Sequence, residues 1–462
     1  MTDTTSSQYL NDCHRNFSMY VLQTRGFPSI IDGLKHGGRR LLWTARDGSK
    51  YKTATLAGAT MPLHPHADAS DTVDTLTKPY CNNYPLFSGY GAFGTRLKPN
   101  ASGAPRYTAV TVSPFTKDVL FRDIELIPMV ENYDGELMEP KHFLPLVPVA
   151  LVNPSEGIGV GFASKIYPRS LGDIIDAQLA NLAGKPFNAE PAINVIPFQA
   201  TSVSSEVIKS GNTRYWFEGT FERVDSSTIR ITNLPYGIDH LEFVEHLNEL
   251  KEADTIASHD DRSSNVIDIT IKFGRGALKH LSDAQLMRCL KLRASVVENM
   301  NLVDFTGNRV VSLTYSEVIA GFTQWRLDWY LTRYLRLKEL LERDIQRHRD
   351  VILAIKEDVG RHGRLCADRT QLKDWLAGKG IVYTDYVADL PMYRLTEEEA
   401  KKVARKLEEA LVQLKIYQSY IDNPDERKKI YVQELKEVKK KYADVNFTPP
   451  PVVKEKKVRA KA

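Results

Sequence analysis

Ser102-Gly103-Ala104-Pro105-Arg106-Tyr107-Thr108 places a tyrosine directly after an arginine, shortly after the glycine-rich loop Ser88-Gly89-Tyr90-Gly91-Ala92-Phe93-Gly94. A phenol has an unperturbed pKa of about 10 and is a poor nucleophile, so a catalytic tyrosine needs nearby cations that favour the phenolate and stabilise charge on the attacked group. Arg106 is one such cation. We therefore interpret Tyr107 as a nucleophile. The alternative is a strand in which this tyrosine packs or caps.

A tyrosine nucleophile suits a phosphodiester substrate. Attack on DNA would form a phosphotyrosine diester and free one sugar hydroxyl. Because one phosphodiester replaces another, the step is close to energy-neutral and reversible. Such chemistry is typical of an enzyme that opens DNA and reseals it.

Six short motifs follow one another between Arg25 and Ile166. They are RGFPSIIDGLKHGGRR at 25–40, His64-Pro65-His66-Ala67-Asp68, the glycine-rich loop, Arg106-Tyr107-Thr108, Asn132-Tyr133-Asp134-Gly135, and Leu151-Val152-Asn153 through Gly157-Ile158-Gly159-Val160-Gly161. Their order and spacing resembles the DNA-breakage subunit of type IIA topoisomerases, the class of the gyrase A and topoisomerase IV A subunits. The resemblance continues more faintly to Tyr442.

The resemblance implies roles for individual residues. It makes Tyr107 the nucleophile that cuts one strand per protomer through a 5′-phosphotyrosine linkage, with Arg106 and Arg25 stabilising phosphate charge and His66 hydrogen-bonding near the scissile site. It also implies that Lys35, Arg39 and Arg40 hold the DNA backbone and that Ile158 intercalates. No metal ligand in this chain is implied.

Two of these motifs can also be interpreted from the residues alone. The turn Asp32-Gly33-Leu34-Lys35 predicts a following helix with Arg39 and Arg40 on one side and apolar residues on the other, as a helix that contacts phosphates has; the alternative is a solvated charged face. Glycines on both sides of Ile158 predict a bare apolar wedge that can kink DNA. A buried isoleucine in a tight hairpin is the alternative.

Length and composition indicate a soluble protein of several domains. The chain has 462 residues, 42% hydrophobic and 26% charged, which is more than one core accommodates. It has no apolar run of the roughly 20 residues that a membrane span needs, and no secretory signal. Four widely spaced cysteines predict reduced thiols and therefore a cytoplasmic protein. If the resemblance to phage enzymes described below holds, this is the cytoplasm of a phage-infected bacterial cell.

The positive charge is concentrated at the two ends of the chain. Net charge is only +4, but residues 1–110 hold twelve Lys and Arg against seven Asp and no Glu. The last nine residues, KEKKVRAKA, are also basic, and we expect residues 446–462 to be a disordered tail. This distribution favours a nucleic-acid partner.

The predicted fold class is α+β and multidomain. We expect a winged-helix domain with the catalytic tyrosine at 1–165, an α/β tower domain at 166–328, and a long antiparallel coiled coil with a helical exit-gate head at 329–445. Tower strands are predicted at 215–221, 228–232 and 266–273, and helices at 171–182, 241–250 and 283–292. Heptad-like spacing predicts a long helix at 331–359 and a return helix capped by Thr396, although an ordinary helical hairpin fits the same pattern.

Motifs for ATP and metal are missing from the sequence. It has no P-loop and no acidic pairing of the kind that holds magnesium in the TOPRIM fold. We therefore expect Mg²⁺ and ATP on an ATPase/TOPRIM partner subunit, and none on this chain alone. The sequence also ends soon after the return helix, and this layout resembles the medium subunit of phage-encoded type II topoisomerases of the T-even sort.

The function expected from these observations is DNA cleavage and religation within an ATP-dependent type II topoisomerase, which relaxes or decatenates DNA. The expected partners are double-stranded DNA, a second copy of this chain and the ATPase/TOPRIM subunit, with no membrane. The alternative is a non-enzymatic DNA-binding scaffold with a coiled-coil dimerisation arm.

Overall fold

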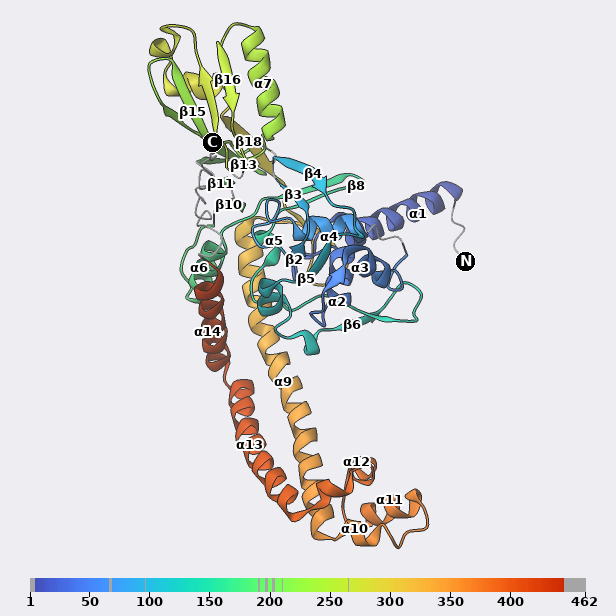
Figure 1. The fold of residues 1–462 in the computed structure, drawn as a ribbon. Helices are drawn as coiled ribbons and strands as arrows, with labels where there is room; N and C mark the ends of the chain where they lie inside the picture. The colour runs from blue at the N-terminus through green and yellow to red at the C-terminus, as the bar shows by residue number, and fades with distance from the viewer. Residues whose placement is uncertain are drawn as a thin grey trace, which may run out of the picture. The chain divides into compact units, whose positions relative to one another are not determined.

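The computed structural model describes residues 5–65, 69–95, 97–189, 192–195, 198–201, 204–209, 211–264 and 266–443. These residues form two compact units. The N-terminal unit comprises Met1–Thr323 together with Glu434–Ala462, and the helical arm comprises Gln324–Gln433. Helices and sheets are mixed, which confirms the predicted α+β class (Figure 1). The predicted domain boundaries at 165, 328 and 445 stay predictions.

The first part of the N-terminal unit combines helices with a small sheet. Its helices are α1 (Ser6–Val21), the π-helix η1 (Leu22–Gly26), α2 (His36–Thr44), α3 (Thr53–Thr60) and α4 (Ala69–Thr77). Strands β1 (Tyr51–Lys52), β5 (Ala109–Val112) and β2 (Phe87–Tyr90) form an antiparallel sheet in that order, and β3 (Phe93–Thr95) pairs with β4 (Lys98–Ser102). The predicted helix after Lys35 is confirmed as α2, which buries Leu41 and Leu42 in the core.

The chain then passes through short elements to a hairpin. These elements are η2 (Thr116–Leu120), η3 (Ile124–Leu126), the paired strands β6 (Met129–Glu131) and β7 (Met138–Pro140), and α5 (Val149–Val152). Strands β8 (Ser155–Gly159) and β9 (Phe162–Ile166) form the hairpin, in which Ile158 lies opposite Ala163. Gly161 in the turn has a φ of 76°, in the left-handed region that favours glycine.

A second α/β portion belongs to the same unit. It contains α6 (Leu171–Leu182), β10 (Ala192–Val195), β11 (Phe198–Thr201), β12 (Ser204–Val207), β13 (Thr213–Glu218), β14 (Thr220–Arg223), β15 (Thr228–Asn233), α7 (His240–Glu252), β16 (Ser258–Asp261), β17 (Ile269–Lys272), η4 (Ala277–His280), α8 (Asp283–Cys289), β18 (Arg293–Glu298), β19 (Asn301–Val303) and β20 (Val310–Ser312). A four-stranded sheet, β14-β15-β17-β16, shares its core with α7 and α8. Strand β13 lies between β12 and β18 in a second sheet.

The elements predicted for this portion are present, with three differences. The strand predicted at 266–273 is shorter, since β17 spans only Ile269–Lys272. The predicted strand 215–221 is divided at Gly219, where a Cβ atom would lie 2.7 Å from the carbonyl oxygen of Asn233. Helix α8 ends at Cys289 rather than near 292, and Lys291 there has a positive φ of 50°, which a helix does not allow.

The helical arm consists mainly of two long antiparallel helices. Helix α9 (Tyr315–Lys356) enters it from the N-terminal unit and is followed by α10 (Val359–His362), α11 (Arg369–Gly378), α12 (Thr384–Ala388), η5 (Met392–Leu395), α13 (Glu397–Asp422) and α14 (Pro424–Tyr442). Tyr334 of α9 lies 4.8 Å from Tyr420 of α13, ring centroid to ring centroid. The two helices therefore run side by side, as Figure 1 shows.

The predicted start of the return helix agrees with the structure. The side chain of Thr396 accepts a hydrogen bond from the Glu399 amide at the start of α13, and Pro424 is the first residue of α14. Helix α9 begins 16 residues before the predicted 331 and ends at Lys356, three residues before the predicted 359. Among the residues that the structure describes, no helix combines the length and apolarity needed to cross a membrane.

Candidate functional site

Tyr107 projects from a tight turn that precedes β5. Its amide donates to the carbonyl of Ala104 (2.8 Å), and the Gly103 amide donates to that of Ala92 (2.8 Å). The next residue, Thr108, is buried and bonds through its hydroxyl to that of Thr53 (2.8 Å). The Tyr107 side chain is 68% exposed. The alternative of a tyrosine packed in a strand is therefore wrong, because Tyr107 lies before the strand and its ring is open to solvent.

Cations surround this turn. The guanidinium carbon of Arg106 lies 4.7 Å from the centre of the Tyr107 ring, so the two neighbours stack. The ammonium of Lys52 on β1 donates to the Tyr107 carbonyl (3.4 Å). Lys52 was not among the predicted site residues; it reaches Tyr107 because β1 pairs with β5, with Lys52 opposite Ala109. That pairing joins residues more than 50 positions apart, and the sequence holds no signal for it.

The glycine-rich loop fits closely against its surroundings. A Cβ atom on Gly89 would lie 2.6 Å from the Thr77 side chain and 2.7 Å from that of Phe93. Gly91 has a φ of 101°, and a Cβ there would meet Thr108 at 3.6 Å. These two glycines let the loop pass directly behind the turn that presents Tyr107.

Arg39 does not face solvent. Its guanidinium forms a two-bond ion pair with Asp32, with Nε to Oδ2 at 2.7 Å and Nη2 to Oδ1 at 2.9 Å, and its side chain is 4% exposed. Burial alone would raise the pKa of Asp32, but the charge and hydrogen bonds of Arg39 and the Phe143 amide hold that pKa below its usual value. The burial of Arg39 and its ion pair with Asp32 argue against the predicted contact with the DNA backbone, which stays a prediction.

Arg40 is engaged in the same way. Its Nε and Nη2 bind the two carboxylate oxygens of Glu139 at 2.5 and 2.9 Å, and the two side chains are 11% and 9% exposed. The alternative of a solvated helix face is wrong, while the phosphate contact of Arg40 stays a prediction, which its ion pair with Glu139 argues against. The reason is that an acid pairs with each cation of α2: Asp32, seven residues before Arg39, and Glu139, 99 residues after Arg40.

Lys35 forms a hydrogen bond with the backbone of the β8–β9 hairpin. Its ammonium donates to the carbonyl of Glu156 on β8 (2.6 Å). Burial lowers the pKa of Lys35, and the charge of Glu156 partly offsets this. An ammonium has three N–H donors, so Lys35 can hold β8 and still bind a phosphate oxygen. Its role toward DNA stays a prediction.

Ile158 is 86% exposed, the most of any large hydrophobic side chain in the described chain. The glycines on either side of it face inward: a Cβ on Gly157 would lie 2.0 Å from the Gly26 carbonyl oxygen, and one on Gly159 would lie 2.1 Å from Leu22. The hairpin thus packs its backbone on η1 and turns Ile158 outward. The alternative of a buried isoleucine is wrong.

Two further predicted residues cannot be tied to Tyr107. Arg25 is exposed in η1, next to Gly26, which packs against the hairpin. His66 lies outside the described residues. Arg25 lies beside the hairpin, and the roles predicted for Arg25 and His66 stay predictions.

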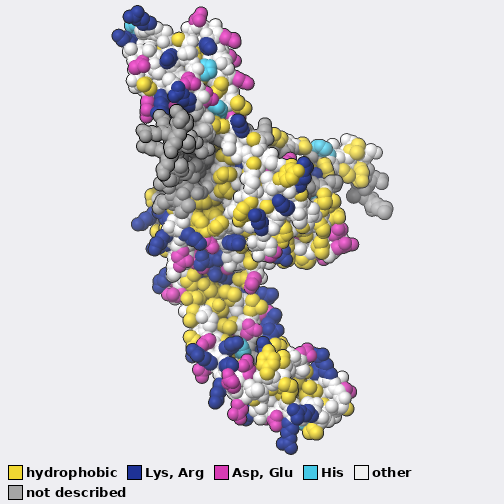
Figure 2. Space-filling view, viewed as in Figure 1, with side chains coloured by type: hydrophobic (Ala, Val, Ile, Leu, Met, Phe, Trp, Pro, Cys, Tyr) yellow, Lys and Arg dark blue, Asp and Glu magenta, His cyan; other side chains and the backbone are white. Residues whose placement is uncertain are grey.

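The helical arm carries charges of both signs on the face that Figure 2 shows. Figure 2 shows Lys and Arg side chains interspersed with Asp and Glu over the helical arm. In the described ranges, no three His, Cys, Asp or Glu side chains converge as a metal site requires.

Comparison with known proteins gives a consistent set of relatives. A family model described as the DNA gyrase/topoisomerase IV A subunit matches residues 25–436. The chain is 27% identical to the DNA gyrase A subunit of Haloquadratum walsbyi, over 94% of this chain and 55% of that protein. It is 31% identical to the mitochondrial DNA topoisomerase 2 of Dictyostelium discoideum, over 71% of this chain and 26% of that protein.

A solved structure has the same fold. It is the DNA-binding, cleavage and re-ligation domain of Plasmodium falciparum topoisomerase II, matched with a TM-score of 0.80 at 22% identity over 93% of this chain and 64% of that one. The chain spans about half the length of the gyrase A subunits that it matches.

Proposed function

The chain belongs to the family of DNA gyrase and topoisomerase IV A subunits, and from this premise we propose that it is the DNA cleavage and religation component of a type II topoisomerase. The observation that carries the proposal is Tyr107, presented to solvent on a rigid turn beside Arg106. On the same unit, the β8–β9 hairpin presents Ile158.

The proposed chemistry needs no external energy. The phenolic oxygen of Tyr107 attacks a DNA phosphorus, the new bond is a 5′-phosphotyrosine ester, and the bond from phosphorus to the 3′ oxygen breaks. The proton of the phenol is lost as the bond forms, and the 3′ oxygen leaves as a hydroxyl. The reverse attack by that hydroxyl restores the DNA and frees Tyr107.

Arg106 and Lys52 would supply the positive charge that this step requires. The attacked phosphate gains charge on its oxygens in the transition state, and fixed cations beside it are the usual means of stabilising that charge. Arg106 is held against the Tyr107 ring, and Lys52 is anchored on the backbone of the same turn. Both are therefore positioned relative to the nucleophile before DNA binds.

Ile158 would bend the DNA. An exposed apolar side chain that enters a base step unstacks it and kinks the duplex. Phosphate contacts can hold straight DNA, so the wedge is needed for geometry rather than for affinity. The kink would place the two scissile phosphates within reach of the two tyrosines of a dimer.

The partners are part of the proposal. We propose double-stranded DNA, a second copy of this chain, and an ATPase/TOPRIM subunit that brings ATP and Mg²⁺, the layout that resembles phage-encoded enzymes. Apolar side chains exposed on the end of the helical arm support contact with a second copy; they are Leu365, Val382, Met392 and Tyr393.

A trapped covalent adduct tests the proposal. Duplex DNA with a sulfur in place of the 3′ bridging oxygen releases a thiolate that religates poorly, so cleaved complexes accumulate. With the ATPase/TOPRIM partner and Mg²⁺ present, the wild type should form an adduct that survives denaturation, and Tyr107→Phe should bind DNA equally well and form none. A non-enzymatic scaffold would give no adduct from either protein.

A further inference from the structure

Two asparagine side chains form hydrogen bonds with the hairpin that carries Ile158. Asn299, just after β18, and Asn301, the first residue of β19, each donate a side-chain N–H to the carbonyl of Ala163, both at 2.7 Å. Ala163 is the residue opposite Ile158 in the hairpin. The two side-chain amides therefore hold Ala163 in place, and Ala163 is the residue paired with Ile158.

The backbone on the same side reinforces this contact. Lys165 donates its amide to the carbonyl of Asn299 (2.7 Å), and the amide of Asn299 donates to the carbonyl of Lys165 (3.0 Å). The hydroxyl of Ser164 donates to the carbonyl of Asn301 (2.8 Å). The segment 299–301 thus lies along β9, joined to it by an isolated antiparallel bridge between Lys165 and Asn299 and by side-chain hydrogen bonds.

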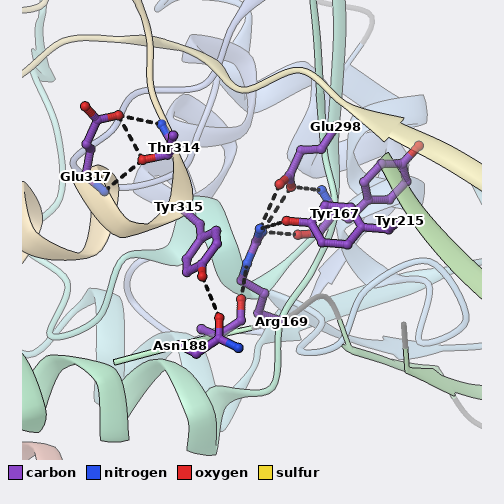
Figure 3. Close-up of polar contacts among 9 residues, drawn as sticks. Tyr167, Arg169, Asn188, Tyr215, Glu298, Thr314, Tyr315 and Glu317 are labelled. Atoms are coloured by element: carbon purple, nitrogen blue, oxygen red, sulfur yellow. Dashed lines mark hydrogen bonds and ion pairs between the residues drawn. The ribbon is translucent and has the colours of Figure 1, made fainter. Parts of the chain in front are cut away.

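A buried ion pair fixes the lower end of the hairpin. One carboxylate oxygen of Glu298 accepts from the Tyr167 amide (3.0 Å) and from Nη1 of Arg169 (3.0 Å), and the other accepts from Nη2 of Arg169 (2.7 Å). Arg169 is fully buried, donates from Nε to the Ala189 carbonyl (2.8 Å) and lies over the ring of Tyr315. Figure 3 shows these groups converging on the guanidinium. The contacts thus reach the first turn of α9.

A wedge needs such bracing. An isolated two-stranded hairpin is marginally stable in water. Unstacking a base step costs free energy, so a hairpin that is not held in place would shift instead of inserting Ile158 between the bases. The far side of the hairpin rests on η1 through Gly157 and Gly159, which contribute no side chains. Apart from this packing and the bond from Lys35 to the Glu156 carbonyl, the side-chain hydrogen bonds that resist displacement come from the side of Ala163.

We propose that Asn299 and Asn301 are positioning residues for DNA bending, because they fix the direction and depth at which Ile158 enters the base step. This inference rests on the proposed function and goes beyond it, since it assigns the setting of the bend angle to residues that do not touch DNA. The Glu298–Arg169 pair anchors the segment from which both asparagines act.

The test compares variants at Asn299, which is only partly buried. Asn299→Ala removes one donor to Ala163, and Asn299→Asp keeps the size of the side chain while replacing that donor by an acceptor. Asn308→Ala, at an exposed asparagine in the turn between β19 and β20, is the matched control. Each is assembled with the ATPase/TOPRIM partner, and bending is read by energy transfer across an end-labelled duplex.

Asn299→Ala should lower the equilibrium for bending, and with it cleavage of continuous duplex, about fivefold, which is what one hydrogen bond contributes to an equilibrium. Asn299→Asp should lose more, and Asn308→Ala should match the wild type. On duplex that already carries an unpaired, flexible base step at the insertion site, the difference between Asn299→Ala and wild type should fall below twofold. A merely misfolded variant would not be rescued by such DNA.

The outcomes separate the inference from its premise. If the wild type forms adducts and bends DNA while Asn299→Ala and Asn299→Asp bend it equally well, the asparagines do not position the wedge. An equal defect of these variants on continuous and pre-kinked duplex also overturns the inference. If the wild type itself forms no adduct, the proposed function fails instead.

Discussion

Replacement of Arg39 by methionine should destabilise the N-terminal unit and leave DNA contacts intact. The side chain is 4% exposed and its charge is matched by Asp32, which is fully buried and bound at 2.7 and 2.9 Å. Removing one partner of such a pair leaves an uncompensated buried charge, which costs about 3 to 5 kcal/mol. The amides of Leu34 and Phe143 still bind Asp32 and keep the loss within that range.

The loss should depend on pH in a definite direction. In the wild type the pKa of Asp32 is lowered by folding, so its contribution to stability is present above the unfolded pKa of about 3.9 and is lost as pH falls through the folded pKa. Without Arg39, burial raises the folded pKa of Asp32, and its destabilising effect disappears once acid protonates it. The difference between variant and wild type should therefore be largest at neutral pH and shrink toward pH 4.

Urea unfolding of the full chain at pH 7 and pH 5 measures both effects. The control is Arg46→Met, since Arg46 is exposed and stacks on Trp43 at the end of α2; it should change stability by no more than about 0.5 kcal/mol. Equal unfolding midpoints for Arg39→Met and wild type, together with a flatter salt dependence of DNA binding, would refute the reasoning and return Arg39 to the DNA interface.

Three further predictions concern the DNA-facing residues. Ile158→Ala should reduce bending, measured by energy transfer, and cleavage far more than affinity, since it removes only the wedge; equal bending by both proteins would exclude Ile158 as that wedge. Gly157→Ala should reproduce the Ile158→Ala defect, because its Cβ would lie 2.0 Å from the Gly26 carbonyl oxygen, whereas Gly161→Asn, in open space at a φ that asparagine tolerates, should not; equal cleavage by Gly157→Ala and wild type would contradict the tight packing. Lys52→Met should lower the slope of log K against log salt by about 0.9 if the exposed ammonium meets one phosphate, and an unchanged slope in a binding titration would place it off the DNA.

The sequence predicted features that depend on local pattern. The helix after Lys35 and the outward-facing Ile158 each follow from neighbouring residues, and the order of the family motifs singled out Tyr107. The start of α9 has a local signal too, although the predicted start was later. Thr314 and Glu317 form a reciprocal cap, with the Thr314 amide bonded to the Glu317 carboxylate (2.8 Å) and the Glu317 amide to the Thr314 hydroxyl (3.3 Å).

Features that depend on distant partners could not be predicted. Arg40 meets Glu139 from 99 residues away, and Lys52 meets Tyr107 from 55. Whether a cation on a helix binds DNA or a buried acid depends on such tertiary contacts, and the spacing of residues in the sequence does not predict them. This is why Arg40 was assigned to phosphate; the partner of Arg39, Asp32, lies only seven residues upstream, and the sequence pattern does not show that the two side chains turn toward each other. The asparagines at 299 and 301 were missed for the same reason, since Ala163 is 136 residues away from the first of them.

Identification of the tyrosine that becomes bonded to DNA tests the central claim most directly. The trapped complex, formed with the ATPase/TOPRIM partner and Mg²⁺ on the sulfur-substituted duplex, is digested with nuclease and trypsin, and the modified peptide is sequenced by mass spectrometry. The account predicts one modified residue, Tyr107, with the phosphate linked to the 5′ end of the released strand. A nucleotide on any of the other tyrosines, or an adduct that persists in Tyr107→Phe, would contradict it.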